Sequence, residues 1–98
     1  MADLRFEWDA EKNAANRRKH GVSFEEAQTV FFDEEALLLA DPEHSESEER
    51  FVLLGLSASL RLLLVCHCYR RVGRVIRIIS ARKADRRERR QYAQRWSR

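Results

Sequence analysis

The fold of this chain is decided by its middle, residues 50–80, whose sequence is RFVLLGLSASLRLLLVCHCYRRVGRVIRIIS. Leu, Val and Ile dominate three stretches of this segment, Arg50–Leu56, Leu60–Tyr69 and Arg74–Ser80, and turn signals separate them. Strands joined by such short loops pair antiparallel, so the pattern predicts a β-meander. A shorter stretch, Ala36–Asp41, predicts a fourth strand before it.

Helices are predicted on both sides of the meander. Asp9 is a suitable N-cap for a helix that continues to about Lys19, and Ser23 begins a second helix. The segment Arg82–Trp96 has the composition of a basic helix with a narrow packing stripe. Two N-terminal helices, an antiparallel meander of about four strands and a basic C-terminal helix make an α+β fold. A length of 98 residues predicts a single domain over residues 1–98.

The lengths of the turns predict which residues lie opposite one another in the meander. A three-residue loop at 71–73 would pair His67 with Arg77. A loop of two or four residues within Ser57–Leu60 would pair Arg50 with His67. The sequence therefore predicts a row of Arg50, His67 and Arg77 across three adjacent strands, on a polar face opposite an apolar face that takes the helices. A slip of one residue in either turn would break this row.

Two guanidinium groups beside an imidazole suit the binding and cleavage of a phosphodiester. Arginine presents a planar fork of donors and keeps its charge, while histidine titrates near neutral pH and can move a proton. Such a set can stabilise the added negative charge of a pentacovalent transition state. RNA supplies its own nucleophile, the 2′-hydroxyl group, and the sequence lacks the clustered Asp and Glu of two-metal nucleases. The row therefore predicts cleavage without a metal or another cofactor.

Structural roles for the same residues stay open at this stage. Arg50 and Arg77 can each pair with a carboxylate, and His67 can be a hydrogen-bonded histidine at the margin of the core. Lys19 and His20 suit the negative end of a helix dipole, which gives them an adequate role without catalysis.

Charge is strongly segregated along the chain. Between Glu25 and Glu49 there are ten acidic residues and no Lys or Arg, whereas between Arg70 and Arg98 eleven Arg and one Lys stand against two acidic residues. The net charge of +3 therefore conceals segments of about −10 and +10. An arginine-rich end favours a polyanion as ligand, most often nucleic acid. We expect RNA contacts from the basic residues Arg82, Arg86, Arg89 and Arg90.

The cysteines and the N-terminus bear on metal content and compartment. Cys66 and Cys68 alternate along one predicted strand, so both thiols are expected on the core face, with His67 on the opposite face. This division leaves too few ligands for zinc, and no metal is expected. The N-terminus lacks the apolar segment of a signal peptide, and the longest apolar run, Leu62–Cys66, is too short to span a membrane. The expected compartment is the cytoplasm, with no membrane partner.

Short blocks spread over nearly the whole chain carry a family resemblance. They include Phe6-Glu7-Trp8-Asp9, KHGVSFEEA from Lys19 to Ala27, Glu48-Glu49-Arg50-Phe51, and RIISAR from Arg77 to Arg82. In this order and spacing, from about Phe6 to Tyr92, the chain resembles the BrnT family of bacterial toxins from type II toxin–antitoxin modules. The resemblance implies a compact RelE-type ribonuclease that cleaves RNA without metal, stops translation and is neutralised by a cognate BrnA antitoxin. It also raises a set of site candidates, namely Lys19, His20, Arg50, His67, Arg77 and Arg82.

Together these observations predict an RNA-cleaving toxin. Arg77 and Arg82 would hold the scissile phosphate, and Arg50 would stabilise the transition state. His67 or His20 would be the general base or acid. The candidates for orienting an arginine are Glu49 and Glu88.

Two other classes of protein remain as alternatives. One is a non-catalytic nucleic-acid-binding module, and the other is an interaction protein whose basic helix docks on an acidic partner. A homodimer or a toxin–antitoxin hetero-oligomer is compatible with each of them.

Overall fold

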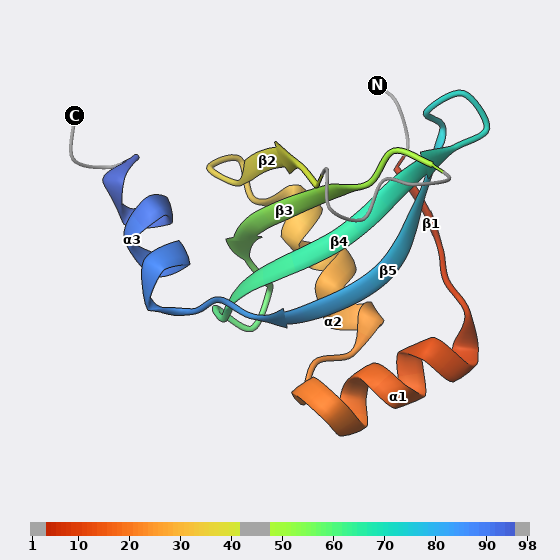
Figure 1. The fold of residues 1–98 in the computed structure, drawn as a ribbon, viewed down its shortest axis with the longest axis horizontal. Helices are drawn as coiled ribbons and strands as arrows, with labels where there is room; N and C mark the ends of the chain where they lie inside the picture. Colours follow the sequence, from red (N-terminus) through yellow and green to blue (C-terminus); the bar gives the residue numbers. More distant parts are fainter. Residues whose placement is uncertain (1–3, 42–47, 96–98) are drawn as a thin grey trace.

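A computed structural model describes residues 4–41 and 48–95 of the chain. One five-stranded sheet lies among three helices, which confirms the predicted α+β fold (Figure 1). The elements are β1 (Arg5–Glu7), α1 (Ala10–His20), α2 (Phe24–Thr29), the 3-10 turn η1 (Val30–Phe32), β2 (Leu37–Ala40), β3 (Phe51–Leu56), β4 (Leu62–Arg70), β5 (Val75–Lys83) and α3 (Arg86–Gln94).

Local capping signals set the first two helices as predicted. The Asp9 carboxylate accepts hydrogen bonds from the backbone N–H groups of Glu11 and Lys12, and Gly21 ends α1 with a left-handed φ of 69°. Ser23 Oγ accepts from the backbone N–H of Glu26 at the start of α2. None of the described helices has the length and apolar character needed to cross a membrane.

The sheet contains one strand more than the sequence predicted. Its order is β1-β5-β4-β3-β2, and β1 pairs parallel with β5 at the edge. At the other end of the chain, β5 continues to Lys83, so the predicted helical start at Arg82 is wrong. Asp85 is the N-cap of α3 and forms a capping box with Glu88, which delays the helix until Arg86. Trp96, the last residue of the predicted helix, lies outside the described residues.

The predicted row of Arg50, His67 and Arg77 is wrong because both turns are longer than predicted. His67 lies opposite Phe51 on β3 and opposite Ile78 on β5. The first loop spans residues 57–61, and the second is a four-residue loop, 71–74. Each extra residue shifts the pairing by one position, so that Cys68 takes the place expected for His67 beside Arg77.

A β-bulge interrupts the pairing of β4 with β5. Cys66 lies opposite Ser80, but the next residue, His67, lies opposite Ile78, so Ile79 is the extra residue on β5. Arg77 and Arg82 are five residues apart, an odd spacing that places two side chains on opposite faces of a regular strand. The bulge restores them to the same face.

The sheet therefore has two faces with different coverings. On the helix face, side chains of β3, β4 and β5 pack against α1 and α2 in a core of Val22, Phe24, Ala27, Val30, Leu53, Leu63, Val65, Ile78 and Ala81. Figure 1 shows α2 crossing behind the sheet and α3 standing at the far end of β5. Cys66 and Cys68 share one face as predicted, but they lie opposite α1 and α2, because Val65 and His67 take the helix-facing positions between and beside them.

Helix α3 covers one end of the second face. Its Tyr92 ring packs with Leu54 and Ala84, and the Tyr92 hydroxyl group donates to Asp33 Oδ2 at 2.7 Å. Burial and the Asp33 carboxylate raise the pKa of Tyr92 to about 12. The rest of this face, toward the β4–β5 turn, is not covered by a described helix (Figure 1).

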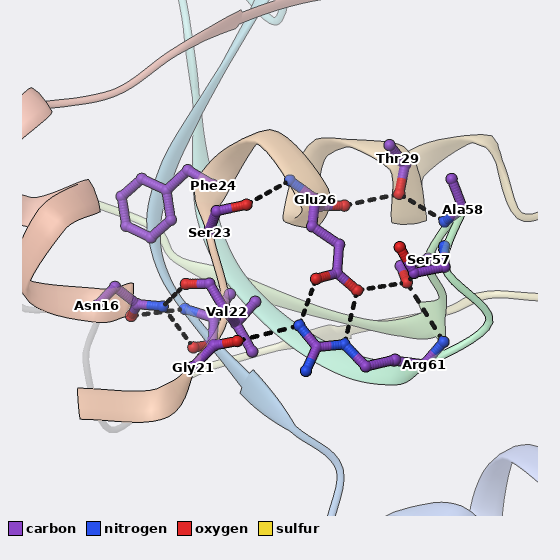
Figure 2. A network of polar contacts seen from close by, with 12 residues as sticks. Asn16, Gly21, Val22, Ser23, Phe24, Glu26, Thr29, Ser57, Ala58 and Arg61 are labelled. Carbon is purple, nitrogen blue, oxygen red and sulfur yellow. Dashed lines mark hydrogen bonds and ion pairs between the residues drawn. The ribbon is translucent and has the colours of Figure 1, made fainter. Parts of the chain in front are cut away.

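A polar network ties α2 to the loop between β3 and β4 (Figure 2). The Glu26 carboxylate accepts from Arg61 Nε at 2.9 Å, from Arg61 Nη2 and from Ser57 Oγ at 2.7 Å. Arg61 also donates to the carbonyl oxygen of Gly21. We call this set the Glu26 network; it closes the end of the core that is nearest to the α1–α2 turn.

Candidate nucleic-acid interface

The second face of the sheet, between the β4–β5 turn and α3, gathers most of the arginines singled out in the sequence. We call it the open face and define it by Arg50, Cys66, Cys68, Arg77 and Arg82. Residues directly opposite in adjacent strands point to the same side, and Cys68 lies opposite Arg77 while Leu64 lies opposite Arg82. Cys66 and Cys68 alternate with Leu64 along β4, so all these side chains share one face.

Arg77 is held in place by an acidic residue from the edge strand. Its Nη1 donates to Glu7 Oε2 at 2.9 Å, and Arg70 Nε lies 3.4 Å from the same oxygen. Glu7 lies directly opposite Arg77 in the parallel β1–β5 pair. The structural alternative considered for Arg77, pairing with a carboxylate, therefore holds, with Glu7 as the partner. Glu7 escaped the sequence analysis, although the alternation of polar and apolar residues from Arg5 to Trp8 is typical of a strand.

Arg82 is held by a two-point ion pair with α3. Its two terminal nitrogens donate to the two carboxylate oxygens of Glu88, each at 2.8 Å. Hydrogen bonding from Arg82 lowers the pKa of Glu88, and the same contact raises the pKa of Arg82. Glu88 thus orients an arginine, as predicted, and both groups stay charged at neutral pH.

Arg50 precedes β3, the neighbour of β4, and lies near the Cys66 thiol. The pKa of Cys66 is raised by burial and by the Asp41 carboxylate, and the Arg50 guanidinium partly offsets this. Burial and Glu48 likewise raise the pKa of Cys68, against Arg70 and Arg77. The two thiols are therefore neutral near pH 7, and the charged groups around them are the Arg50, Arg70 and Arg77 guanidiniums and the Asp41 and Glu48 carboxylates.

His67 lies on the helix face, away from these arginines. Its side chain is 0% exposed, and its ring packs edge-on against Phe31. Nδ1 lies 3.0 Å from the carbonyl oxygen of Val65, and Nε2 lies 3.2 Å from the hydroxyl group of Tyr69. Burial lowers the pKa of His67, so the imidazole is neutral at pH 7. The second structural alternative, a hydrogen-bonded core histidine, describes this geometry.

The other predicted site residues lie at three places. Lys19 and His20 form the last turn of α1, which packs against β5 through the Asn16 side chain and the Ala81 backbone. Glu49 is exposed and precedes Arg50 at the start of β3. The remaining candidates are exposed on α3, and they are Arg86, Arg89 and Arg90.

The geometry of the open face suits an extended anion. Arg50 and Arg77 flank β4 from its two neighbours, which places their backbones roughly 10 Å apart at ordinary strand spacing. Arg82 lies opposite Leu64 and Arg77 opposite Cys68, a separation of roughly 13 Å along β4. Such spacing serves successive groups of a polyanion better than one small ion. In the described parts of the chain, no three His, Cys, Asp or Glu side chains group as metal ligands.

A small α+β protein with an arginine-lined sheet face has the features of proteins that bind phosphate polyanions. The comparisons with known proteins give the family. A model described as "Ribonuclease toxin, BrnT, of type II toxin-antitoxin system" matches residues 8–88, and the chain belongs to this family. A search among curated proteins found no match.

A solved structure confirms the fold. The crystal structure of the Brucella abortus ribonuclease toxin BrnT, determined at 1.1 Å resolution, is similar with a TM-score of 0.64 and 20% sequence identity. The alignment covers 86% of this chain and 100% of the Brucella chain. The predicted resemblance to BrnT toxins and the predicted fold are therefore both confirmed.

Proposed function

We propose that this toxin is a metal-independent endoribonuclease that cleaves RNA on the open face. The supporting observation is that Arg50, Arg77 and Arg82 share this face, with Arg77 and Arg82 each fixed by a carboxylate. Arginines held in this way are preorganised donors, which stabilise a transition state without further ordering. Cleavage of RNA in the cytoplasm would stop translation, as the family resemblance implies.

In this proposal Arg50 and Arg77 bracket the scissile phosphodiester above Cys66 and Cys68. Together they would offset the extra negative charge as the 2′-hydroxyl oxygen attacks phosphorus and the 5′-oxygen leaves. Arg82 is too far along β4 to share that phosphate, so we assign it to the neighbouring one. This is a change from the role predicted from the sequence, and the register of β4 and β5 is its reason.

Cleavage also needs a group that accepts the proton of the 2′-hydroxyl group. The neutral thiols on the open face do not serve as bases at pH 7, and His67 faces the core. Glu49, predicted from the sequence as a carboxylate that orients an arginine, precedes Arg50 of the open face in the chain and is exposed. We propose Glu49 as the acceptor of the 2′-hydroxyl proton, which is a change from its predicted role. His20 and His67, the acid–base candidates predicted from the sequence, and the site candidate Lys19 are the alternatives.

The first experiment incubates the purified chain with labelled RNA in EDTA or in magnesium. Cleavage should be equal in both, and the product should end in a 2′,3′-cyclic phosphate or its hydrolysis product. Loss of cleavage in EDTA that magnesium restores would falsify the metal-independent mechanism. Full activity of Glu49→Gln would return the acid–base role to His20, Lys19 or His67, whose substitutions then follow in the same assay.

The second experiment tests the arginines. Arg77→Ala should abolish cleavage, and Arg77→Lys should restore it only in part, because a point charge does not replace a planar fork. Arg18→Gln is the matched control, since Arg18 is an exposed arginine in the last turn of α1. Cleavage by Arg77→Ala at the rate of the control would remove Arg77 from the site.

We propose a BrnA-type antitoxin as the neutralising partner, because type II modules pair a toxin with a protein antitoxin. The exposed arginines of α3 adjoin the open face, so an acidic partner could cover both. Opposite charges on the toxin and the antitoxin raise the association rate more than they raise the affinity. Reversing the charge of Arg86, Arg87 and Arg90 together should slow association and flatten its salt dependence. Unchanged rates would place the antitoxin on another surface.

A further inference from the structure

A cavity lies at the end of the sheet opposite α3, beside the β4–β5 turn (Figure 1). We call it the hairpin cleft; its volume is about 900 Å³. Its lining includes Leu4, Arg5, Tyr69, Arg71, Arg74 and Ile76. None of the roles assigned above uses this cleft.

The hairpin cleft is basic. Arg5, Arg71 and Arg74 line it and are exposed. Within residues 4–41 and 48–95, no carboxylate forms an ion pair with any of the three, whereas the neighbouring Arg70 is shared with Glu7. Three guanidinium groups of one sign around a cavity raise the local concentration of an anion.

The cleft also contains one fixed aromatic ring. Tyr69 is 40% exposed, and its hydroxyl group lies 3.2 Å from the buried Nε2 of His67. The ring centroid lies 5.3 Å from that of Phe51, with an interplanar angle of 58°. These two contacts fix the orientation of the Tyr69 ring, and the exposed part of the side chain lines the cleft. Burial raises the pKa of Tyr69, so the phenol is neutral and does not repel an anion.

The turn itself holds the two arginines near the ring. Arg71 and Val72 have backbone φ values of 53° and 57°, in the left-handed region that residues other than glycine rarely adopt, and Gly73 follows with a φ of 80°. The backbone N–H of Arg74 donates to the carbonyl oxygen of Arg71 at 3.3 Å. The closed turn therefore presents Arg71 and Arg74 together, on either side of its tip.

We propose that the hairpin cleft binds an unpaired nucleotide of the RNA substrate, outside the scissile bond. The base stacks on Tyr69, and the flanking phosphates contact Arg71 and Arg74. An aromatic platform among cations is the combination that binds single-stranded nucleic acid without base preference. This inference rests on the proposed function. Tyr69 alternates with Arg70 along β4 and so points to the helix side of the sheet, and the RNA strand would pass the β4–β5 turn to reach Arg70 and Arg77 on the open face.

The test measures binding of a 2′-O-methyl RNA oligonucleotide of about twelve nucleotides, which lacks the attacking hydroxyl groups. Fluorescence anisotropy over a range of salt concentrations gives affinity and salt slope for the full chain. Arg71→Gln combined with Arg74→Gln should reduce the magnitude of the slope by about 1.4, since each phosphate contact on a single strand contributes about 0.7. Arg17→Gln combined with Arg18→Gln removes the same charge from α1 and should leave the slope unchanged.

The stacking contact has its own test. Tyr69→Leu should weaken binding about tenfold, and Tyr69→Phe, which keeps the ring, should bind nearly as the natural chain does. An abasic oligonucleotide of the same length has the phosphates without the bases, so Tyr69→Leu should not change its affinity. With cleavable RNA, these variants should raise KM and leave kcat unchanged, because the cleft does not touch the reacting atoms.

Several outcomes would overturn the inference. An unchanged slope in the Arg71 and Arg74 variant, or equal effects of Tyr69→Leu on normal and abasic oligonucleotides, would each remove RNA from the cleft. Weaker binding of the antitoxin with unchanged RNA affinity would assign the cleft to a protein partner. Because the oligonucleotide is not cleaved, failure of the proposed ribonuclease chemistry leaves these binding results interpretable.

Discussion

Replacing Glu26 with glutamine is the sharpest test of what holds the two helices on the sheet. The Glu26 side chain is 14% exposed and accepts three hydrogen bonds, two from Arg61 and one from the buried Ser57. Glutamine keeps the shape but loses the charge, and its amide group faces the guanidinium with one acceptor oxygen. The Arg61 side chain is 33% exposed, so water can hydrate its guanidinium group and replace part of the lost interaction.

These contacts set the size of the expected loss. A hydrogen bond to a charged group contributes about 1.5–3 kcal/mol, and a neutral one about 1 kcal/mol. The partial exposure of Arg61 keeps the cost below the 3–5 kcal/mol or so of a fully buried pair. We therefore expect Glu26→Gln to lower the free energy of unfolding by about 2 kcal/mol. At about 4–8 °C for each kcal/mol, the melting temperature falls by about 8–16 °C.

Urea unfolding followed by circular dichroism measures this loss, with Glu25→Gln as the control. Glu25 is the exposed neighbour of Glu26 and accepts only from Asn13 among the described side chains, so its variant should change stability by less than about 0.5 kcal/mol. A double-mutant cycle with Arg61→Gln should give a coupling energy of about 1 kcal/mol or more. A coupling near zero, or a Glu26→Gln variant as stable as the control, would refute the assigned role of the network.

The acid side of the stability profile gives an independent check. Hydrogen bonding from Arg61 lowers the pKa of Glu26 below its ordinary value of 4.5. The carboxylate is favoured in the folded state, so its contribution is present above the unfolded pKa and is lost as pH falls through the lower folded pKa. The Glu26→Gln variant should lose this part of the acid dependence.

Three further predictions concern single positions. Burial lowers the pKa of His67, so the unfolded state binds a proton first, and stability should fall by up to about 1.4 kcal/mol per pH unit below about pH 6.5; urea unfolding of His67→Phe, compared with the natural chain, should show a weaker dependence in that window. A Cβ atom at Gly55 would lie 2.9 Å from Val30 Cγ1, so Gly55→Ala should cost about 1–3 kcal/mol in the same assay, and a variant of unchanged stability would contradict this packing. Glu88→Gln releases the two-point hold on Arg82 and should lower kcat/KM for RNA about ten- to a hundredfold, whereas an unchanged value would show that Arg82 acts without this partner.

The parts of the fold that were predicted from the sequence depend on local signals. Asp9 and Ser23 cap the helices that they precede, and the alternation of Leu, Val and Ile marks β3, β4 and β5. The strand β1 is three residues long and pairs with a segment about 70 residues away, so its neighbours in the chain carry little information about it.

The predicted register of β3, β4 and β5 was wrong for a different reason. Turn sequences favour a conformation but do not fix loop length, and a loop one residue longer exchanges the two faces of a strand. The exchange placed Cys68 where His67 was expected and moved His67 into the core. Arg50 and Arg77 stayed on the polar face, so the prediction of an arginine-lined surface survived the loss of its histidine.

The bulge at Ile79 makes the open face depend on length as well as on composition. A strand has a phase, and each inserted or deleted residue reverses it. The six residues Arg77–Arg82 hold two arginines in the same phase only because one residue between them is unpaired. Many substitutions at Ile79 would keep this count, whereas deleting it would turn Arg77 or Arg82 toward the apolar core residues, where burial of an unpaired charge is costly. In this short segment, therefore, the number of residues is itself part of the site.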